Sequence, residues 1–244
     1  MRIFTSVIVF FLLTACGSTK KAHSSLAVDL PKSRDAIVAQ TTIQKVDIVK
    51  AVKNEYITAP VVNDSTFVNL YDYSHDFIFK MKYATAENFL KTKVYDCEAC
   101  YLRYKTVKAL LKAQEKFMKK GYRIVLFDCY RPLDIQKKMW QIVPNPSYVA
   151  DPKKGSIHNR GGAVDISLAD ADGNELDMGT GFDHFGPEAA QDYENLPESV
   201  LENRKLLRKT MINSGFRVFE SEWWHYNLKN ARREPISNFQ WICD

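Results

Sequence analysis

Apolar residues recur at helical spacing in two long stretches of the chain. Residues 102–120 place one set of side chains on a single helix face, namely Val107, Leu110, Leu111, Phe117 and Met118. A second stretch begins at Pro197 and ends at Gly215, with Val200, Leu201, Leu206, Leu207, Met211 and Ile212 at the same spacing. The pattern predicts two amphipathic helices, and residues 133–140 predict a shorter one after Pro132.

Four shorter stretches have the composition of β-strands. Residues 122–127, 163–168, 216–219 and 222–228 are rich in β-branched and aromatic side chains. The strands adjoin turns, and helices and strands alternate without a βαβ rhythm. We therefore expect a single α+β domain, residues 61–244, with a mostly antiparallel central sheet flanked by helices.

The first fifteen residues have the pattern of an export signal. Arg2 precedes a short apolar run, and the run ends in Leu13-Thr14-Ala15-Cys16. The run is shorter than the roughly 20 residues of a membrane span. Leu-Thr-Ala-Cys resembles a bacterial lipobox, which predicts a lipoprotein signal peptide at residues 1–15 and a lipidated Cys16; an ordinary signal peptide is the alternative. We expect a periplasmic protein anchored by lipid to the inner or outer membrane.

Charge and composition separate a tether from the domain. Residues 17–60 contain one aromatic, Tyr56, with seven basic and four acidic residues, so residues 16–60 are predicted to be a flexible tether. The chain has a net charge of +5, but residues 61–244 contain 26 basic and 25 acidic residues. A nearly neutral domain gives no reason to expect a nucleic-acid partner.

Two short clusters contain residues suited to metal chemistry. His158 lies in a glycine-containing loop before Asp165, and Glu222 precedes His225 by three positions. His158, Asp165 and His225 are therefore candidate metal ligands, with Glu222 as a free carboxylate. Two histidines, one carboxylate and an open position are typical of a catalytic zinc site, where water reaches a pKa of about 7 and a carboxylate takes its proton. We expect one zinc ion per chain.

These clusters also resemble a known family. Ser156-x-His158-x-x-Gly161-x-Ala163-x-Asp165, joined to Glu222-Trp-Trp-His225, is similar to the D-alanyl-D-alanine dipeptidases, which are zinc peptidases. Four more motifs match in order: Tyr83-Ala84-Thr85-x-x-Asn88-Phe89, Asp128-x-Tyr130-Arg131-Pro132, Met178-Gly179-Thr180-x-Phe182-Asp183 and Met211-x-Asn213-Ser214-Gly215-Phe216. The resemblance covers nearly the whole predicted domain and implies that the three candidate ligands bind zinc.

The resemblance implies a role for each further matched residue. Glu222 would be the general base and acid, and Arg131 would stabilise the oxyanion. Asp183, with Tyr83 beside it, would hold the substrate ammonium. Ser156 would contact the substrate peptide or its carboxylate.

The implied reaction is zinc-dependent hydrolysis of the D-alanyl-D-alanine dipeptide to two D-alanines. One alternative is a D,D-carboxypeptidase acting on peptidoglycan stem peptides, although an ammonium clamp at Asp183 and Tyr83 argues against a longer substrate. Another is a non-catalytic zinc-binding envelope module, which would need neither Glu222 nor Arg131. An exported enzyme cannot reach the cytoplasmic dipeptide removed by family members in glycopeptide resistance. We therefore expect a role in wall turnover or scavenging, and the oligomeric state stays open.

Four cysteines remain besides Cys16, namely Cys97, Cys100, Cys129 and Cys243. A single C-x-x-C pair without a second one does not form a zinc finger, and an oxidising periplasm favours disulfides. Three connectivities are possible. A bond at Cys129 would brace the turn that carries Arg131, while His75 and His184 are expected to be structural or solvated.

Overall fold

The computed structural model describes residues 60–243. The predicted signal peptide, Cys16 and the predicted tether up to residue 59 lie outside the described residues. The described strands are β1 (Phe67–Asn69), β2 (Ile78–Phe79), β3 (Tyr101–Arg103), β4 (Arg123–Asp128), β5 (Ala163–Ala169), β6 (Phe216–Phe219) and β7 (Glu222–Leu228). The described helices are α2 (Tyr104–Met118), α3 (Leu133–Ile142) and α4 (Glu198–Ile212). None of them is both long and apolar enough to cross a membrane.

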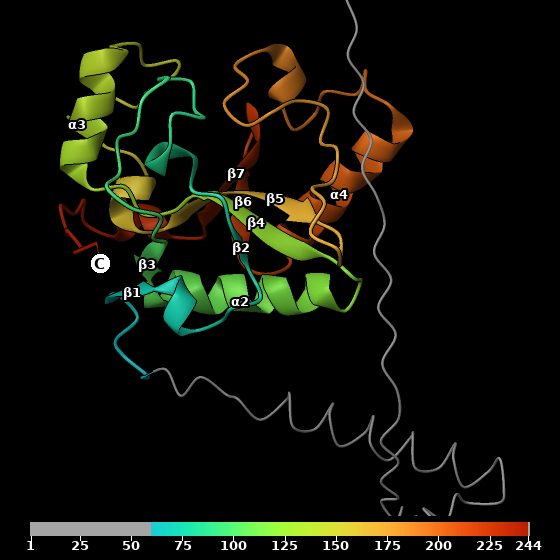
Figure 1. The fold of residues 1–244 in the computed structure, drawn as a ribbon, viewed down its shortest axis with the longest axis horizontal. Coiled ribbons are helices and arrows are strands. Elements are labelled where there is room, and N and C mark those ends of the chain that lie inside the picture. The colour runs from blue at the N-terminus through green and yellow to red at the C-terminus, as the bar shows by residue number, and fades with distance from the viewer. Residues whose placement is uncertain (1–59, 244) are drawn as a thin grey trace, which may run out of the picture. The chain divides into compact units, whose positions relative to one another are not determined.

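Five strands form the central sheet in the order β2-β4-β5-β7-β6 (Figure 1). The pairs β4–β5, β5–β7 and β6–β7 are antiparallel, and only the short β2 pairs in parallel, with β4. β1 and β3 form a separate antiparallel pair. The predicted α+β class with a mostly antiparallel sheet is thus confirmed.

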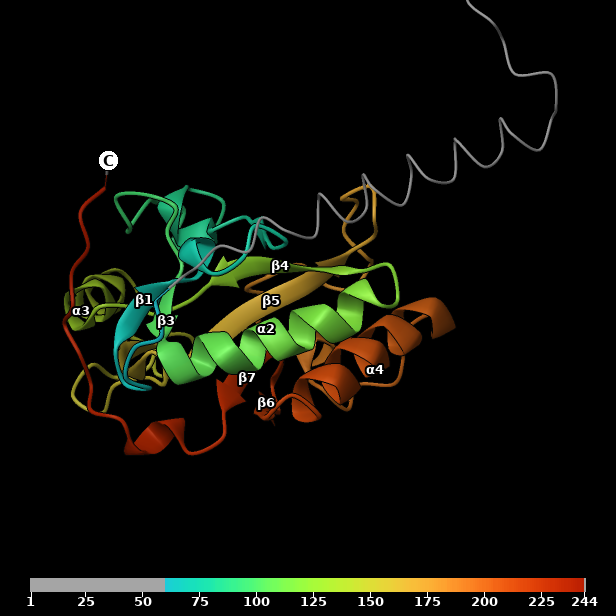
Figure 2. The ribbon, with the colours of Figure 1, turned by 90° about the horizontal axis from the view of Figure 1, so that it is seen from below.

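Helices α2 and α4 lie side by side along one face of this sheet (Figure 2). Their apolar faces supply the core, because Val107, Leu110 and Phe117 of α2 and Leu207 and Met211 of α4 are fully buried. Burial of these side chains is what holds two amphipathic helices against a sheet. The opposite face is left for α3 and the long loops, which carry the candidate site (Figure 1).

The predicted helix boundaries and burial need three corrections. Residues 101–103 form β3, since they pair with β1, so α2 begins at Tyr104. Met118 and Ile212 were placed on buried faces but are 45% and 38% exposed. Leu111, Leu201 and Leu206 are only partly buried, whereas the polar Arg204 lies inside.

Arg204 holds the loop between β5 and α4 in place. Its guanidinium donates to three loop carbonyls, those of Met178 (2.7 Å), Glu188 (2.8 Å) and Ala190 (3.1 Å). The same group lies 5.8 Å from the ring centre of Trp223, whose indole N–H donates to Thr180 at 2.8 Å. One buried cation therefore fixes a loop without regular strands, and that loop contains Asp183.

We predict that Arg204→Met destabilises the protein. The substitution keeps much of the apolar stem but leaves buried carbonyls without a donor, which costs about 3 kcal/mol, or about 10 °C in Tm. Thermal unfolding measures the change. Lys205→Met, one position along and exposed, is the control; equal Tm values for the two variants would contradict this account of the loop.

Candidate active site

The register of the central strands places two aspartates and one histidine in a single row across the sheet. Asp165 of β5 stands opposite Asp128 of β4 on one side and opposite His225 of β7 on the other. His158 enters from the loop before β5, where Gly161 takes a φ of +69°. A Cβ at Gly161 would lie 2.5 Å from the ring of Phe67, so only glycine allows this close approach.

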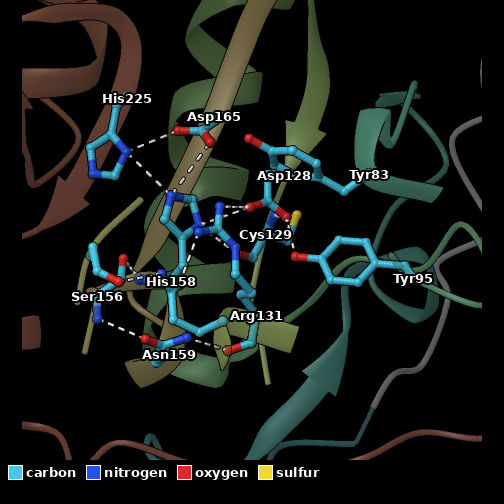
Figure 3. Close-up of polar contacts among 12 residues, drawn as sticks. Tyr83, Tyr95, Asp128, Cys129, Arg131, Ser156, His158, Asn159, Asp165 and His225 are labelled. Carbon is cyan, nitrogen blue, oxygen red and sulfur yellow. Dashed lines mark hydrogen bonds and ion pairs between the residues drawn. The ribbon is translucent and has the colours of Figure 1, made fainter. Parts of the chain in front are cut away.

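The structure brings His158, Asp165 and His225 together (Figure 3). Nε2 of His158 lies 3.4 Å from Asp165 Oδ2 and 3.2 Å from His225 Nδ1. His225 Nδ1 lies 2.9 Å from Asp165 Oδ1. A tetrahedral zinc site with bonds of about 2.0–2.1 Å separates its ligand atoms by about 3.3 Å, so the spacing suits this ion.

The outer nitrogens of both imidazoles are held by acceptors. Nδ1 of His158 contacts the carbonyl oxygen of Cys129 at 2.6 Å, and Nε2 of His225 contacts Asn227 Oδ1 at 3.0 Å. Since these oxygens accept, each outer nitrogen carries the hydrogen. The two inner nitrogens then point lone pairs at each other, an arrangement that a cation between them relieves.

Asp165 supplies a third unused electron pair. Its buried Oδ1 has no hydrogen bond of good geometry within residues 60–243. Burial raises the pKa of Asp165, but both histidines outweigh it and keep that pKa below its usual range. Burial lowers the pKa of His225, and the Asp165 carboxylate reverses this, raising it to about 9. In the absence of a metal, His225 therefore holds a proton on the nitrogen that faces Asp165. A metal cation would replace that proton and bind both imidazole nitrogens and the carboxylate oxygen.

Glu222 lies beside this cluster. Its Oε2 is 3.8 Å from His225 Nδ1, although residues three apart on a regular strand face opposite ways. The pairing of β6 with β7 shifts between Val218 and Phe219, and this irregularity lets both side chains face the same cavity. Burial raises the pKa of the Glu222 carboxyl, while His225 opposes the rise.

Arg131 is buried next to Asp128. Nη2 donates to Asp128 Oδ2 at 2.6 Å, and Nη1 donates to Gln136 at 3.0 Å. Burial lowers the pKa of Arg131, but Asp128 outweighs it and keeps the guanidinium charged. Arg131 lines the cavity, and its buried Nε has no acceptor among the described residues.

Asp183 and Tyr83 form a separate acidic site in the same cavity. Asp183 Oδ1 accepts from the Tyr83 hydroxyl at 3.0 Å, and Oδ2 accepts from the Phe89 N–H at 3.3 Å. The Asp183 backbone is left-handed, with φ of 61°, a region that aspartate tolerates better than most residues. Burial, and then the charge of Asp165, raises the pKa of Asp183 to about 8.

The shared cavity has a volume of about 640 Å³. Ser156 lines it, and the Ser156 hydroxyl accepts from the His158 backbone N–H at 3.1 Å. Three basic side chains line it as well, from Lys154, Arg160 and Arg232. Acidic, metal-binding and basic groups thus face one space.

Several supporting residues escaped the sequence analysis. Asp128 was only part of a motif, yet it is fully buried and pairs with Arg131. Asn227, two positions after His225, could have been found because alternate residues share a strand face. Gln136 gave no signal. His184 is half-exposed and contacts Glu188 at 3.0 Å, away from the metal cluster, as expected.

Comparison with known proteins identifies the family of the chain. Residues 63–242 match the model of the D-ala-D-ala dipeptidase family (Peptidase_M15). The D-alanyl-D-alanine dipeptidase of Escherichia coli K12 is 37% identical over 168 residues, covering 69% of this chain and 87% of that protein. The Enterococcus faecium D-alanyl-D-alanine dipeptidase is 31% identical over 196 residues, which cover 70% of this chain and 94% of that protein. The solved structure of a vancomycin resistance D,D-pentapeptidase in complex with Zn(II) has 16% identity and a TM-score of 0.36. The match covers 54% of this chain and 75% of that one.

The family match and the curated relatives define a metallopeptidase. Within that class, the chain belongs to the D-alanyl-D-alanine dipeptidase family, as its motifs predicted.

We predict that Asn227→Ala weakens metal binding by about 10–100-fold, because the His225 ring loses the acceptor that orients it. Competition with a chelator measures the affinity. Asn195→Ala, at an exposed position on the α4 side of the loop, is the control. Unchanged affinity in Asn227→Ala would mean that Asn227 does not orient the ring.

Proposed function

We propose that the protein hydrolyses free D-alanyl-D-alanine to two D-alanines, with one zinc ion per chain held by His158, Asp165 and His225. The observation that carries the proposal is a clustered ligand set in one cavity with the Asp183–Tyr83 pair. Membership of the dipeptidase family supports the same substrate.

Asp183 and Tyr83 bind the amino terminus in this proposal. The Asp183 carboxyl, with a pKa raised to about 8, gives up its proton when a substrate ammonium arrives to pair with it. An acylated amine carries no charge, so it cannot offset the desolvation free energy of a buried Asp183 carboxylate. The pair therefore selects a free dipeptide over the end of a longer peptide.

Glu222 and Arg131 then act on the scissile bond. A zinc ion, when bound, supplies a Lewis acid that polarises a carbonyl and acidifies water. Glu222 takes a proton from the attacking water and returns it to the leaving amine, a role suited to a carboxyl of raised pKa. Arg131 donates to the oxyanion, a contact whose loss costs about 2.7–4 kcal/mol in comparable sites.

The substrate carboxylate has partners in the same cavity. Ser156 offers its hydroxyl, and Lys154, Arg160 and Arg232 supply positive charge. A zwitterionic dipeptide fits a cavity that has the Asp183–Tyr83 pair for its ammonium and three basic residues for its carboxylate. The cavity volume of about 640 Å³ is larger than the volume of a dipeptide, so a longer peptide would also have room. A D,D-carboxypeptidase acting on stem peptides is therefore the second candidate.

We further propose that the enzyme is exported and anchored by lipid at Cys16 to a bacterial membrane. The lipobox-like Leu13-Thr14-Ala15-Cys16 supports this proposal. In the periplasm, the substrate would be dipeptide released from the wall, in turnover or in scavenging of D-alanine.

A substrate panel tests the proposed specificity. We expect purified, zinc-loaded protein to cleave D-Ala-D-Ala but neither L-Ala-L-Ala nor an N-acylated D-Ala-D-Ala peptide. Asp183→Asn should raise KM for the free dipeptide by about 10–100-fold, because the buried ammonium loses its counter-charge. Preferential cleavage of the acylated peptide would favour the carboxypeptidase.

Removal of the proposed general base should separate turnover from metal binding. Glu222→Gln keeps the size of the side chain, and we expect kcat to fall by about 10²–10⁴-fold with zinc content unchanged. The exposed Glu220→Gln is the matched control. A Glu222→Gln protein with wild-type kcat would assign the proton transfer to another group.

Membrane fractionation tests the anchor. Cys16→Ala removes the thiol that would carry the lipid, so we expect the variant to move from the membrane fraction to the soluble fraction. Retention of the variant in the membrane fraction would overturn the lipid anchor and leave the dipeptidase proposal standing.

A further inference from the structure

Two disulfides fix the irregular segment between Ala84 and β3. Residues 85–100 contain no helix or strand. Cys100 is bonded to Cys129, 29 residues later, and Cys97 is bonded to Cys243 near the chain end. Cys100 and Cys129 are fully buried, and Cys129 directly follows β4. Both disulfides cross-link this irregular segment to a distant part of the chain. Only the Cys100–Cys129 bond reaches the end of β4, next to the candidate site.

The backbone of Cys129 contacts both the metal cluster and the carboxylate that binds Arg131 (Figure 3). Its carbonyl oxygen accepts from His158 Nδ1 at 2.6 Å, and its N–H donates to Asp128 Oδ1 at 2.9 Å. Asp128 Oδ2 in turn accepts from Arg131 at 2.6 Å. Both polar groups of one residue therefore orient the candidate zinc ligand and the carboxylate that holds the arginine.

Little regular structure remains to hold Cys129. The ladder between β4 and β5 ends at Asp128, after a register shift between Leu126 and Asp128. Beyond it, the chain is held by backbone bonds from Tyr130 to Tyr101 and from Arg131 to His158. The Tyr130 N–H belongs to the same planar peptide group as the Cys129 carbonyl, and its acceptor Tyr101 directly follows Cys100. The disulfide between Cys100 and Cys129 therefore holds together the two segments whose contact orients that carbonyl.

We propose that the Cys100–Cys129 disulfide is a positioning device for His158 and Arg131, so that the site is complete only in the oxidised protein. Forming the bond removes two electrons and two protons from the two thiols, and a small disulfide oxidant accepts them and leaves as two thiols. The inference rests on the proposed function for its effect on turnover, but its effect on metal binding is measured independently. It ties the activity of the enzyme to an oxidising compartment.

Two matched double variants test the proposal. Cys100→Ala/Cys129→Ala should bind zinc about 10–100-fold more weakly in chelator competition, the usual effect of losing an outer partner of a ligand. Its kcat at saturating zinc should fall by at least about tenfold. The visible spectrum of the Co²⁺-loaded protein should shift, since the His158 ligand is displaced. Cys97→Ala/Cys243→Ala should match the wild type in affinity, spectrum and kcat.

A redox comparison covers the case in which the first variant does not fold. Cys97→Ala/Cys243→Ala protein is kept reduced from expression onward, then half of it is oxidised with glutathione disulfide. We expect the oxidised half to show the tighter zinc binding and the wild-type Co²⁺ spectrum. Equal affinity and equal spectra in the two halves would overturn the proposal. Oxidised wild type that binds zinc normally but fails to cleave D-Ala-D-Ala would instead refute the proposed function.

Discussion

Asp128, Asp165 and His225 stand opposite one another on β4, β5 and β7, and the candidate site is built around this row. Side chains alternate along a strand, so a shift of one residue in either pairing would turn Asp165 or His225 toward the helices. The apolar partners on the other face prevent such a shift. Leu126 and Ile166 lie opposite each other and are fully buried. The hydrophobic core therefore sets the geometry of the polar cluster.

Much of this arrangement follows from local sequence. The spacing of Val107, Leu110 and Phe117 predicted α2, since a periodic apolar face needs no knowledge of its partner. The short strands β1, β2 and β3 were missed because two or three residues carry too little pattern. Arg204 was missed for another reason: its burial depends on carbonyls of a loop that precedes α4.

The candidate site also combines local motifs, which the sequence shows, with long-range contacts, which it does not. His158, Asp165, Glu222 and His225 fall in two compact motifs, and the two motifs together indicated a metal site. The contacts that orient them are long-range. Cys129 meets His158 across 29 positions, and nothing in the sequence chose Cys100 as its disulfide partner among three connectivities. Residue types suggest chemistry, whereas the surroundings that tune the chemistry are set by the fold.

The glycine loop before β5 is contacted by distant parts of the chain. Gly161 lies against Phe67 near the start of the described residues, and a Cβ at Gly162 would lie 2.3 Å from the side chain of Ala231 near the end. His158 lies in that loop, and its partner His225 lies only a few residues before Ala231. His158 and His225 are 67 positions apart, so the candidate metal centre forms only after the segment that contains β7 has been synthesised and has folded onto the glycine loop.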